Sequence, residues 1–321
     1  MMDNFHAPPS TETATSTGHI AKAVSTGLRI FPLPPLHLPR GPYTPEMSVL
    51  GTSMTRYESN PVTSPGSILW IIAHPDADSL SHSLYRRGVE HLRHTENHVV
   101  GVDLYAARWN PVLSDDDTSA ATGATLSDRQ RHATLNHMLP SDVTQQQRLV
   151  ADARIVIVQF PLWWYGMPAI LKGWFDRVFT NGFAFGLRDR DGRVRKYGDG
   201  GLAGRRLLPI VTAGDRADAL GPRGISGDID EMLWPLLHGT AHYTGMLPLR
   251  PHLISSADRI DDTTHRRHVR TLATRLATLD TESPIRYRSL RGGDYTDTHQ
   301  LQPHIEPGQR GLTIHRVDSP N

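Results

Sequence analysis

The chain has 321 residues, enough for one large domain or two small ones. Its 34 basic and 33 acidic side chains leave a net charge of +1, so no basic field points to nucleic acid as a partner. No cysteine is present, which excludes disulfides and thiolate chemistry and suits a cytoplasmic protein. We expect no membrane span, because no apolar stretch reaches the roughly 18–20 residues required, and the first residues do not resemble a secretion signal.

Residues 1–66 differ in composition from everything that follows. Serine, threonine and proline dominate, and neither strand nor helix periodicity persists there. Such a segment buries too little apolar surface to offset the entropy lost on ordering. We therefore predict a disordered extension over 1–66, an ordered domain over 67–285 and an irregular tail over 286–321. A translation start at Met47 or Met54 is an open alternative that changes only the extension.

The ordered region alternates apolar runs with amphipathic segments. The runs indicate buried strands at Ile68–Ala73, His98–Leu104, Arg154–Phe160, Arg206–Thr212 and Leu247–Ile254. The amphipathic segments predict helices over Leu80–His94, Ser141–Ala153, Pro168–Phe179, Asp228–Thr244 and Arg259–Leu279. Alternating strands and helices imply a parallel sheet covered on both faces. The prediction is an α/β three-layer sandwich whose five-stranded parallel sheet has the flavodoxin-like order 2-1-3-4-5.

Local signals refine three of the connections. Ser141 and Asp142 predict a helix cap, with Gln145 completing a capping box. Residues 109–128 are expected to form an acidic loop in which three consecutive aspartates, at 115–117, make a solvated turn. The glycine-rich, charged segment 182–204 predicts a hairpin or a mobile loop.

The stretch from Gln159 to Phe179 is the most informative part of the chain. A buried strand ends there in Pro161 and three aromatic side chains, and the chain then restarts as a helix. Aromatic planes at the carboxyl end of a strand call for a flat partner that covers them. Ligands bind at that end in open α/β sheets. We predict that the flat partner is a flavin ring.

The same stretch resembles a known family. Residues 161–179, PLWWYGMPAILKGWFDRVF, are similar to the signature of the NAD(P)H:quinone oxidoreductases. Bacterial relatives of that family include the drug-activity modulator and the ancillary subunit of glutathione-gated potassium efflux. Weaker similarities occur at 73–81, at 210–214, and at 224–228 with 233–236. The resemblance covers about residues 67–255 and implies a flavodoxin-like fold.

The resemblance implies that the loop after the first strand binds the phosphate arm of the flavin. The residues concerned are His74, Ser79, Leu80 and Ser81. Amides at a helix N-terminus are unpaired donors at the positive end of the helix dipole, and His74 and the serines add further donors. The family often has asparagine where Ser81 stands. Ordinary helix capping by Ser79 is the alternative interpretation.

The resemblance also implies that the aromatic stretch holds the isoalloxazine ring through its backbone amides. The residues concerned are Pro161, Leu162, Trp163, Trp164 and Tyr165. Preorganised amide dipoles stabilise the charge that a reduced ring carries. Trp164 and Tyr165 would also line the substrate pocket, where a flat quinone stacks. The alternative is that Trp163 and Trp164 belong to the core. We expect the later Trp174 and Phe175 to lie in the core or at a dimer interface.

The resemblance implies site residues in two further loops. Thr212, Ala213 and Gly214, after the fourth strand, are small residues expected to let the backbone approach the flavin closely. The animal quinone reductases use a tyrosine and a histidine near the flavin, and Ser226 stands at the position of that histidine. No tyrosine lies between Gly214 and Gly224, so this relay is expected to be absent. Ser226 stays a catalytic candidate because it can donate one hydrogen bond, and water is the alternative proton handler. Helix capping is the alternative role for Ser226.

Two other patterns are set aside. His238 and His242 lie four residues apart on a predicted helix, a spacing found in zinc sites, but no glutamate lies between them. We predict no metal site. The glycine-rich run 198–204 precedes a strand instead of following one, so it does not fit the dinucleotide fingerprint.

The resemblance implies a ping-pong NAD(P)H dehydrogenase (quinone). NAD(P)H would pass hydride to flavin N5 and leave, and a quinone or similar flat electrophile would then be reduced by two electrons. FAD is the expected cofactor, with FMN as the alternative. The resemblance also implies a homodimer, with residues 161–179 and 182–204 as interface candidates. Three alternatives stay open: a regulatory flavoprotein of a potassium-efflux transporter, an FMN-dependent azo- or nitroreductase, and a fold that has lost its flavin.

Overall fold

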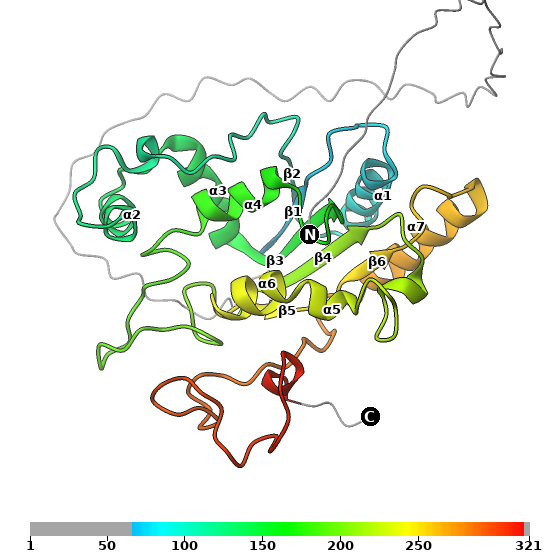
Figure 1. Cartoon of the computed structure of the whole chain (residues 1–321). Helices are drawn as coiled ribbons and strands as arrows, with labels where there is room; N and C mark the ends of the chain where they lie inside the picture. The colour runs from blue at the N-terminus through cyan, green and yellow to red at the C-terminus, as the bar shows by residue number, and fades with distance from the viewer. Residues whose placement is uncertain (1–65, 318–321) are drawn as a thin grey trace, which may run out of the picture. The chain divides into compact units, whose positions relative to one another are not determined.

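The computed structural model describes residues 66–317, so the predicted disorder of residues 1–65 lies outside the described part (Figure 1). Parallel strands follow the order β2-β1-β3-β4-β5, and β6 also pairs with β4. The strands are β1 (Ser67–Ile72), β2 (Val99–Asp103), β3 (Ala153–Pro161), β4 (Arg206–Thr212), β5 (Leu247–Pro248) and β6 (His252–Ile254). The flavodoxin-like strand order predicted from the sequence is confirmed.

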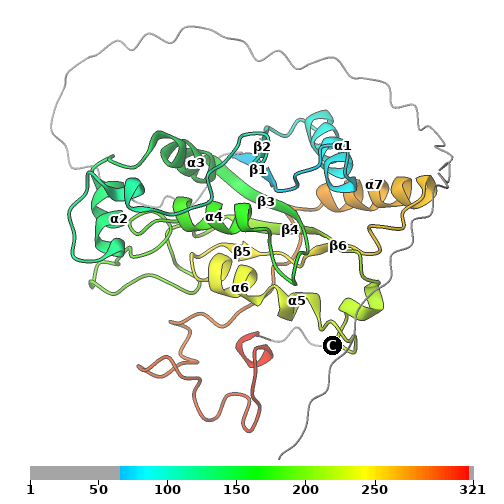
Figure 2. The same ribbon diagram turned by 45° about the horizontal axis from the view of Figure 1, so that its top comes forward.

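Helices cover both faces of the sheet (Figures 1 and 2). On one side α1 lies beside α7, and on the other lie α3, α4 and α6. The helices are α1 (Leu80–His94), α2 (Leu126–Leu135), α3 (Ser141–Asp152), α4 (Ala169–Val178), α5 (Ile229–Met232), α6 (Trp234–Leu236) and α7 (Asp262–Leu276). Successive residues of β1 enter opposite cores: Leu69 faces α4, whereas Trp70 faces α1. Two buried faces explain why the strands are continuous apolar runs without alternation.

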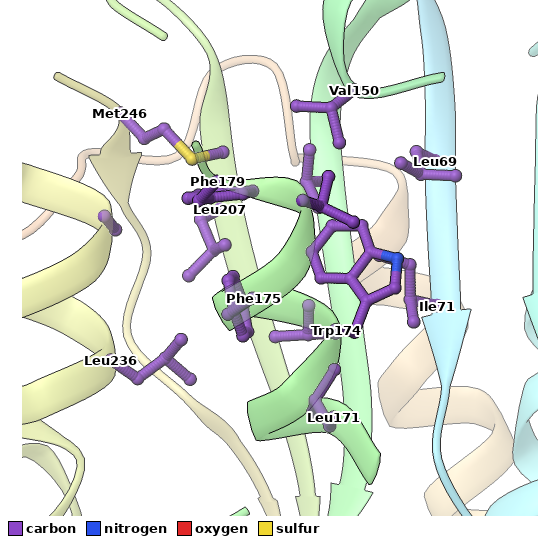
Figure 3. Close-up of a cluster of buried hydrophobic side chains, with 14 of the residues drawn as sticks. Leu69, Ile71, Val150, Leu171, Trp174, Phe175, Phe179, Leu207, Leu236 and Met246 are labelled. Atoms are coloured by element: carbon purple, nitrogen blue, oxygen red, sulfur yellow. The ribbon is translucent and has the colours of Figure 1, made fainter. Parts of the chain in front are cut away.

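An aromatic cluster on α4 fills the larger core (Figure 3). The Trp174 side chain is fully buried, and its ring centroid lies 5.1 Å from that of Phe175, in an edge-to-face arrangement. The indole Nε1 of Trp174 donates a hydrogen bond to Oε1 of Gln146 on α3, at 3.0 Å. These contacts confirm that Trp174 and Phe175 are core residues.

The fifth predicted strand, over 247–254, is divided into β5 and β6. Both short strands pair with β4, so the predicted position at the sheet edge is correct but the continuity is not. β5 donates to β4 through the amides of Leu247 and Leu249, and Pro251, the next residue in this alternation, has no amide hydrogen. The missing donor at Pro251 accounts for the break between the two strands.

The helix predicted over 228–244 is also divided. It consists of α5, α6 and a π-helical segment, Leu237–His242. Pro235 lies near the start of α6 and lacks the amide hydrogen that a continuous helix requires. The predicted capping box at Ser141 is wrong, because Pro140 occupies the N-cap position and no side chain caps α3. The last helix, α7, is shorter than predicted and is capped by Asp261, whose carboxylate accepts from the Thr264 amide at 2.7 Å.

The region predicted as an acidic loop contains a helix that the sequence analysis missed. Thr125 and Asp128 form a reciprocal capping box at the start of α2, a signal that was readable in the sequence. The aspartates at 115–117 form a short 3-10 helix (Asp115–Thr118) and not a fully solvated turn. Asp117 is only 5% exposed, and its carboxylate forms an ion pair with the guanidinium of Arg177 on α4, at 2.7 Å.

The segments after the sheet pack against one another. The 182–204 segment contains an antiparallel bridge between Arg188 and Val194, in agreement with the predicted hairpin. Between residues 284 and 317 the tail is irregular except for one 3-10 turn, Thr313–His315, and two isolated antiparallel bridges. It joins the domain where the Ile285 amide donates to the carbonyl of Pro248, at 2.8 Å.

Candidate functional site

Three strands end beside one another at the carboxyl edge of the sheet. The register places Ile72 of β1 beside Gln159 of β3, and Pro161 of β3 beside Thr212 of β4. The first residue beyond β3 continues this pairing, because the Leu162 amide donates to the Thr212 carbonyl at 2.8 Å. The loops that follow β1, β3 and β4 therefore meet, and these loops carry the three groups of residues predicted to bind a cofactor.

The loop after β1 delivers the N-terminus of α1 to this edge. Ser79 is the N-cap, and its hydroxyl accepts from the His82 amide at 3.3 Å. The amides of Leu80 and Ser81 donate no hydrogen bond to any residue that the structure describes. Capping by Ser79 is therefore present, and it leaves two helix amides free to bind an anion.

The imidazole of His74 belongs to the same loop. Its Nδ1 accepts from the Asp76 amide at 3.1 Å. Burial lowers the pKa of His74 below its ordinary value, with a smaller contribution from the nearby His82. The uncharged ring is therefore favoured, and a bound anion would meet a hydrogen-bonding group here instead of a full positive charge.

Ser81 and Thr212, both predicted to contact the cofactor, bind each other. Their hydroxyl oxygens are 3.0 Å apart, and the two residues are only 2% and 5% exposed. This bond ties the first turn of α1 to the end of β4. The two hydroxyls are therefore engaged with each other, and the amides of the turn are the donors that stay available.

The loop after β3 is a tight turn built from aromatic residues. The amides and carbonyls of Trp163 and Gly166 bond each other at 3.1 and 3.0 Å. The two residues between them, Trp164 and Tyr165, have φ values of 51° and 59°. Positive φ at both central positions is the pattern of a type I′ turn, which glycine and asparagine normally occupy. Strain of this kind is concentrated at functional sites.

The side chains of this turn project into solvent. Trp164 is 98% exposed, Tyr165 56% and Trp163 43%. The alternative that Trp163 and Trp164 are core residues is therefore wrong. The Trp163 ring centroid lies 6.1 Å from that of His74, so the aromatic turn borders the α1 loop. The Trp164 and Tyr165 amides, too, find no acceptor within residues 66–317.

The loop after β4 forms the third side. Ala213 pairs by its backbone with Ile254 and Ala257, each at 2.9 Å, and Gly214 accepts from Arg259 at 2.8 Å. Neither Ala213 nor Gly214 has a positive φ. A methyl group added at Gly214 would meet only Asp258, 3.8 Å away. The protein's own packing does not demand glycine at this position, and the space above it is open.

Ser226 lies on the same side of the site. Its hydroxyl donates to Oδ2 of Asp215 at 2.7 Å, and this bond holds the pKa of Asp215 below its usual value. Asp228, not Ser226, caps α5. The interpretation of Ser226 as a helix cap is therefore wrong. The hydroxyl proton of Ser226 is instead donated to the Asp215 carboxylate.

An apolar groove extends from the aromatic turn. Its volume is about 710 Å³, and it runs between α4 and the α5–α6 region. Side chains from both sides line it, including Tyr165, Met167, Phe175, Phe179, Met232 and Leu236. The groove begins where the turn ends, so a molecule seated in it would border the candidate site.

Sequence reasoning missed two polar residues of this region. Asp215 follows Gly214 directly, but no pattern distinguished it from an ordinary loop residue. Gln159 carried a readable signal, since it is a lone polar side chain in an apolar strand. It is fully buried and bonded to both β1 and α1.

The two patterns set aside in the sequence have structural roles. The rings of His238 and His242 pack 5.3 Å apart, and burial lowers the pKa of His238 to about 3. Within residues 66–317, no group of three or more potential ligands could hold a metal ion. The glycine-rich run lies against the π-helical segment, where the Gly198 amide donates to the His242 carbonyl at 2.8 Å. None of the helices in the described chain is long and apolar enough for a membrane span.

Comparisons with known proteins identify relatives. A family model with a flavodoxin-like fold matches residues 66–276. Human ribosyldihydronicotinamide dehydrogenase (quinone) is 34% identical over 226 residues, which cover 68% of this chain and 94% of that protein. NAD(P)H dehydrogenase (quinone) 1 of Cavia porcellus is 34% identical over 193 residues, which cover 58% of this chain and 66% of that protein. A Klebsiella pneumoniae crystal structure described as a quinone reductase matches with a TM-score of 0.75 and 36% identity, covering 78% of this chain and 100% of that one.

Proposed function

Since the chain belongs to the flavodoxin-like family, alongside NAD(P)H dehydrogenases and quinone reductases, we propose that it is a flavin-dependent oxidoreductase that reduces quinones with NAD(P)H. One observation carries the proposal. Free amides at the N-terminus of α1 and a strained, exposed aromatic turn lie at the same edge of the sheet. An anionic arm on a flat ring matches that pair of features.

The residues of the site suit a flavin. The α1 loop, from His74 to Ser81, would take the phosphate arm, with the Leu80 and Ser81 amides as donors. The turn over 161–165 would face the ring, and the small residues 212–214 would lie along its other edge. We propose FAD as the cofactor, with FMN as the alternative. When bound, the flavin would supply two-electron chemistry between NAD(P)H and a quinone.

The protein's own contribution is stacking, orientation and electrostatics. The free amides of Trp164 and Tyr165 are dipoles fixed by the turn, and fixed dipoles stabilise negative charge without reorganising. The exposed Trp164 ring offers a flat surface on which a quinone can stack. Ser226 donates its proton to an ionised Asp215, so we assign the protonation of the product to water.

We also propose that the protein is a homodimer in which the apolar groove beside the turn is covered. The groove lies on α4, within the 161–179 stretch predicted to form the interface. Tyr165 and Leu126 line the groove and are 56% and 39% exposed, so apolar surface is left there that a partner could bury. A second copy would thereby complete the wall of the substrate site.

The experiment that tests this function is an absorbance spectrum of the purified protein. Flavin bands that bleach on anaerobic addition of NADPH and return with a benzoquinone are the expected result. The cofactor released by denaturation distinguishes FAD from FMN. A colourless protein that neither flavin reconstitutes would refute the enzymatic proposal.

The same assay separates the alternatives. NADH, NADPH and dihydronicotinamide riboside are compared as donors, and a quinone, an azo dye and a nitroarene as acceptors. The proposal requires quinone to be reduced with the highest kcat/KM. Preference for the azo or nitro compound would favour the reductase alternative. Bound flavin with negligible turnover on every acceptor would favour a regulatory role.

A further inference from the structure

A single glutamine joins the strand core to the loop proposed to bind phosphate. Gln159 lies near the end of β3 and is fully buried. Its Oε1 accepts from the indole Nε1 of Trp70 at 2.9 Å, and its Nε2 donates to the carbonyl of Ser81 at 2.7 Å. A buried polar side chain in an apolar strand costs free energy unless it is paired, and these two bonds pair it.

The peptide group that Gln159 contacts has a second role. The carbonyl of Ser81 and the amide of His82 belong to one planar peptide unit. Gln159 binds its oxygen, whereas the hydroxyl of Ser79 binds its nitrogen, at 3.3 Å. The orientation of this unit therefore couples Gln159 to the N-cap. Hydrogen bonds at both ends of one peptide polarise each other and hold the first turn in place.

We infer that Gln159 is a positioning residue for the phosphate-binding turn of α1, and that it acts through the 81–82 peptide. This inference rests on the proposed flavin function. Gln159 contacts no ligand itself. It fixes the orientation of the Leu80 and Ser81 amides. Gln159 therefore strengthens binding of the phosphate arm and does not change binding of the ring.

Neighbouring bonds anchor the same turn from other strands. The Ser81 hydroxyl pairs with Thr212 of β4. The imidazole Nε2 of His82 lies 3.1 Å from the His74 carbonyl and 3.7 Å from a carboxylate oxygen of Asp103, at the end of β2. Gln159 supplies the link to β3, the strand that also carries the aromatic turn. It thus sets the position of the phosphate site relative to the ring site.

The test replaces Gln159 by Glu, which has the same shape. An ionised carboxylate keeps an acceptor for Trp70 but has no hydrogen to donate to Ser81. Because a buried carboxyl that takes up a proton can donate again, Gln159→Met, which has no donor in any state, is measured beside it. The matched control is Gln147→Glu. Gln147 is also buried, on α3, and its Nε2 donates to the Val178 carbonyl at 2.9 Å, away from the α1 loop. Both substitutions remove one buried donor, so both should lower the melting temperature.

The readout is the ratio of the dissociation constants of riboflavin and FMN, measured on the apoprotein well below its melting temperature. Riboflavin has the ring but no phosphate. We expect Gln159→Glu to weaken FMN binding roughly tenfold or more while changing riboflavin binding by less than about threefold. Gln147→Glu should leave the ratio unchanged. Gln159→Met and Gln147→Met are compared in the same way, and this pair decides the outcome if a glutamate variant does not fold.

The outcomes distinguish the inference from the function on which it rests. A wild-type protein that binds none of riboflavin, FMN and FAD overturns both. A wild-type protein that prefers FMN, together with a Gln159 variant of unchanged ratio, overturns the inference and leaves the flavin function standing. A ratio that falls equally in the Gln147 variant also overturns it, because a general loss of stability would then explain the effect.

Discussion

At the scale of single residues, the site combines strain with free donors. Trp164 and Tyr165 hold a left-handed backbone that bulky side chains rarely adopt, at a cost of about 1–3 kcal/mol each. The Trp163–Gly166 bonds keep the turn closed. The strained turn combines two amides that have no acceptor within residues 66–317 with an exposed aromatic side chain.

Ser79 offers a test of the phosphate site. Ser79→Asp keeps a good N-cap residue, so α1 should remain intact, but it adds negative charge where the phosphate is expected. The dissociation constant for the flavin should rise by at least about tenfold, or about 1.4 kcal/mol, and the purified protein should retain less flavin. Ser79→Asn, which caps without charge, is the control and should retain the flavin. Near-normal occupancy in the aspartate variant would contradict the assignment.

Trp164 tests the substrate wall separately. Because its side chain is 98% exposed and its proposed contact with the ring is through the backbone, Trp164→Ala should leave flavin binding unchanged. Loss of the stacking surface should lower kcat/KM for benzoquinone by about five- to tenfold, or about 1–1.4 kcal/mol. Trp164→Phe, which keeps an aromatic plane, should restore most of this loss. Steady-state kinetics with an unchanged kcat/KM would remove Trp164 from the pocket.

At the scale of elements, Arg177 ties α4 to the chain around it. Its guanidinium donates to Asp117 at 2.7 and 2.9 Å and to Asp142 on α3 at 2.8 Å. It also lies 4.6 Å from the ring centroid of Trp109. Arg177 and Asp117 are each only about one-twentieth exposed. The ion pair thus fixes the acidic loop against the helix that follows the aromatic turn.

Breaking the Arg177–Asp117 ion pair should lower the free energy of unfolding. Arg177→Met leaves the Asp117 carboxylate buried without its partner, and we expect unfolding by urea to show a loss of about 3–5 kcal/mol. The double variant Arg177→Met/Asp117→Leu should recover part of that loss, since no charge is then stranded. Lys172→Met, which removes an exposed pair with Asp176 on the same helix, should cost no more than about 0.5 kcal/mol. Equal losses in the two single variants would contradict the buried role.

At the scale of the whole described domain, the irregular tail is held by aromatic packing. The His238 ring stacks on Trp234 with 4.1 Å between centroids and meets Tyr287 of the tail edge-to-face, at 4.9 Å. His242 lies 3.2 Å, through Nε2, from the Arg288 carbonyl of the tail. The π-helical segment thus has the tail on one side and lines the apolar groove on the other. Docking of the tail and the shape of the groove depend on the same short segment.

The buried imidazoles make this arrangement sensitive to acid. Burial lowers the pKa of His238 to about 3, helped by His242 and His315, and burial lowers that of His252 to about 4. The unfolded chain binds these protons near pH 6.5, whereas the folded chain does not. The free energy of unfolding therefore keeps its full value above pH 6.5. It falls as the pH drops toward 4, by at most about 1.4 kcal/mol per pH unit for each histidine.

A substitution at His238 checks this sign. His238→Phe keeps the stacking on Trp234 but cannot take up a proton, so the free energy of unfolding should depend less steeply on pH between 6 and 4. Urea titrations at several pH values measure the slope. A slope identical to that of the wild type would show that His238 is not protonated differently in the folded and unfolded chains.

The sequence alone determined the sheet and the place of the site. Apolar runs without alternation predict strands buried on both faces, and their alternation with helices leaves few topologies. The motif around Trp164 identified the loop after β3, and the exposure of its side chains agrees with a binding role. These features are local in sequence, or recur along it, and are therefore readable without coordinates.

Only the tertiary structure decided the features that depend on distant neighbours. Asp117 is buried because Arg177, 60 residues later, turns toward it. The Ser226 hydroxyl is committed to Asp215, and Gln159 reaches the first turn of α1, 78 residues away in the chain. Pro235 and Pro251 are visible in the sequence. The helix break and the strand break beside them, however, depend on which backbone hydrogen bonds are lost. Long-range hydrogen bonds and burial have no period in the sequence, so they emerge only when the chain has folded.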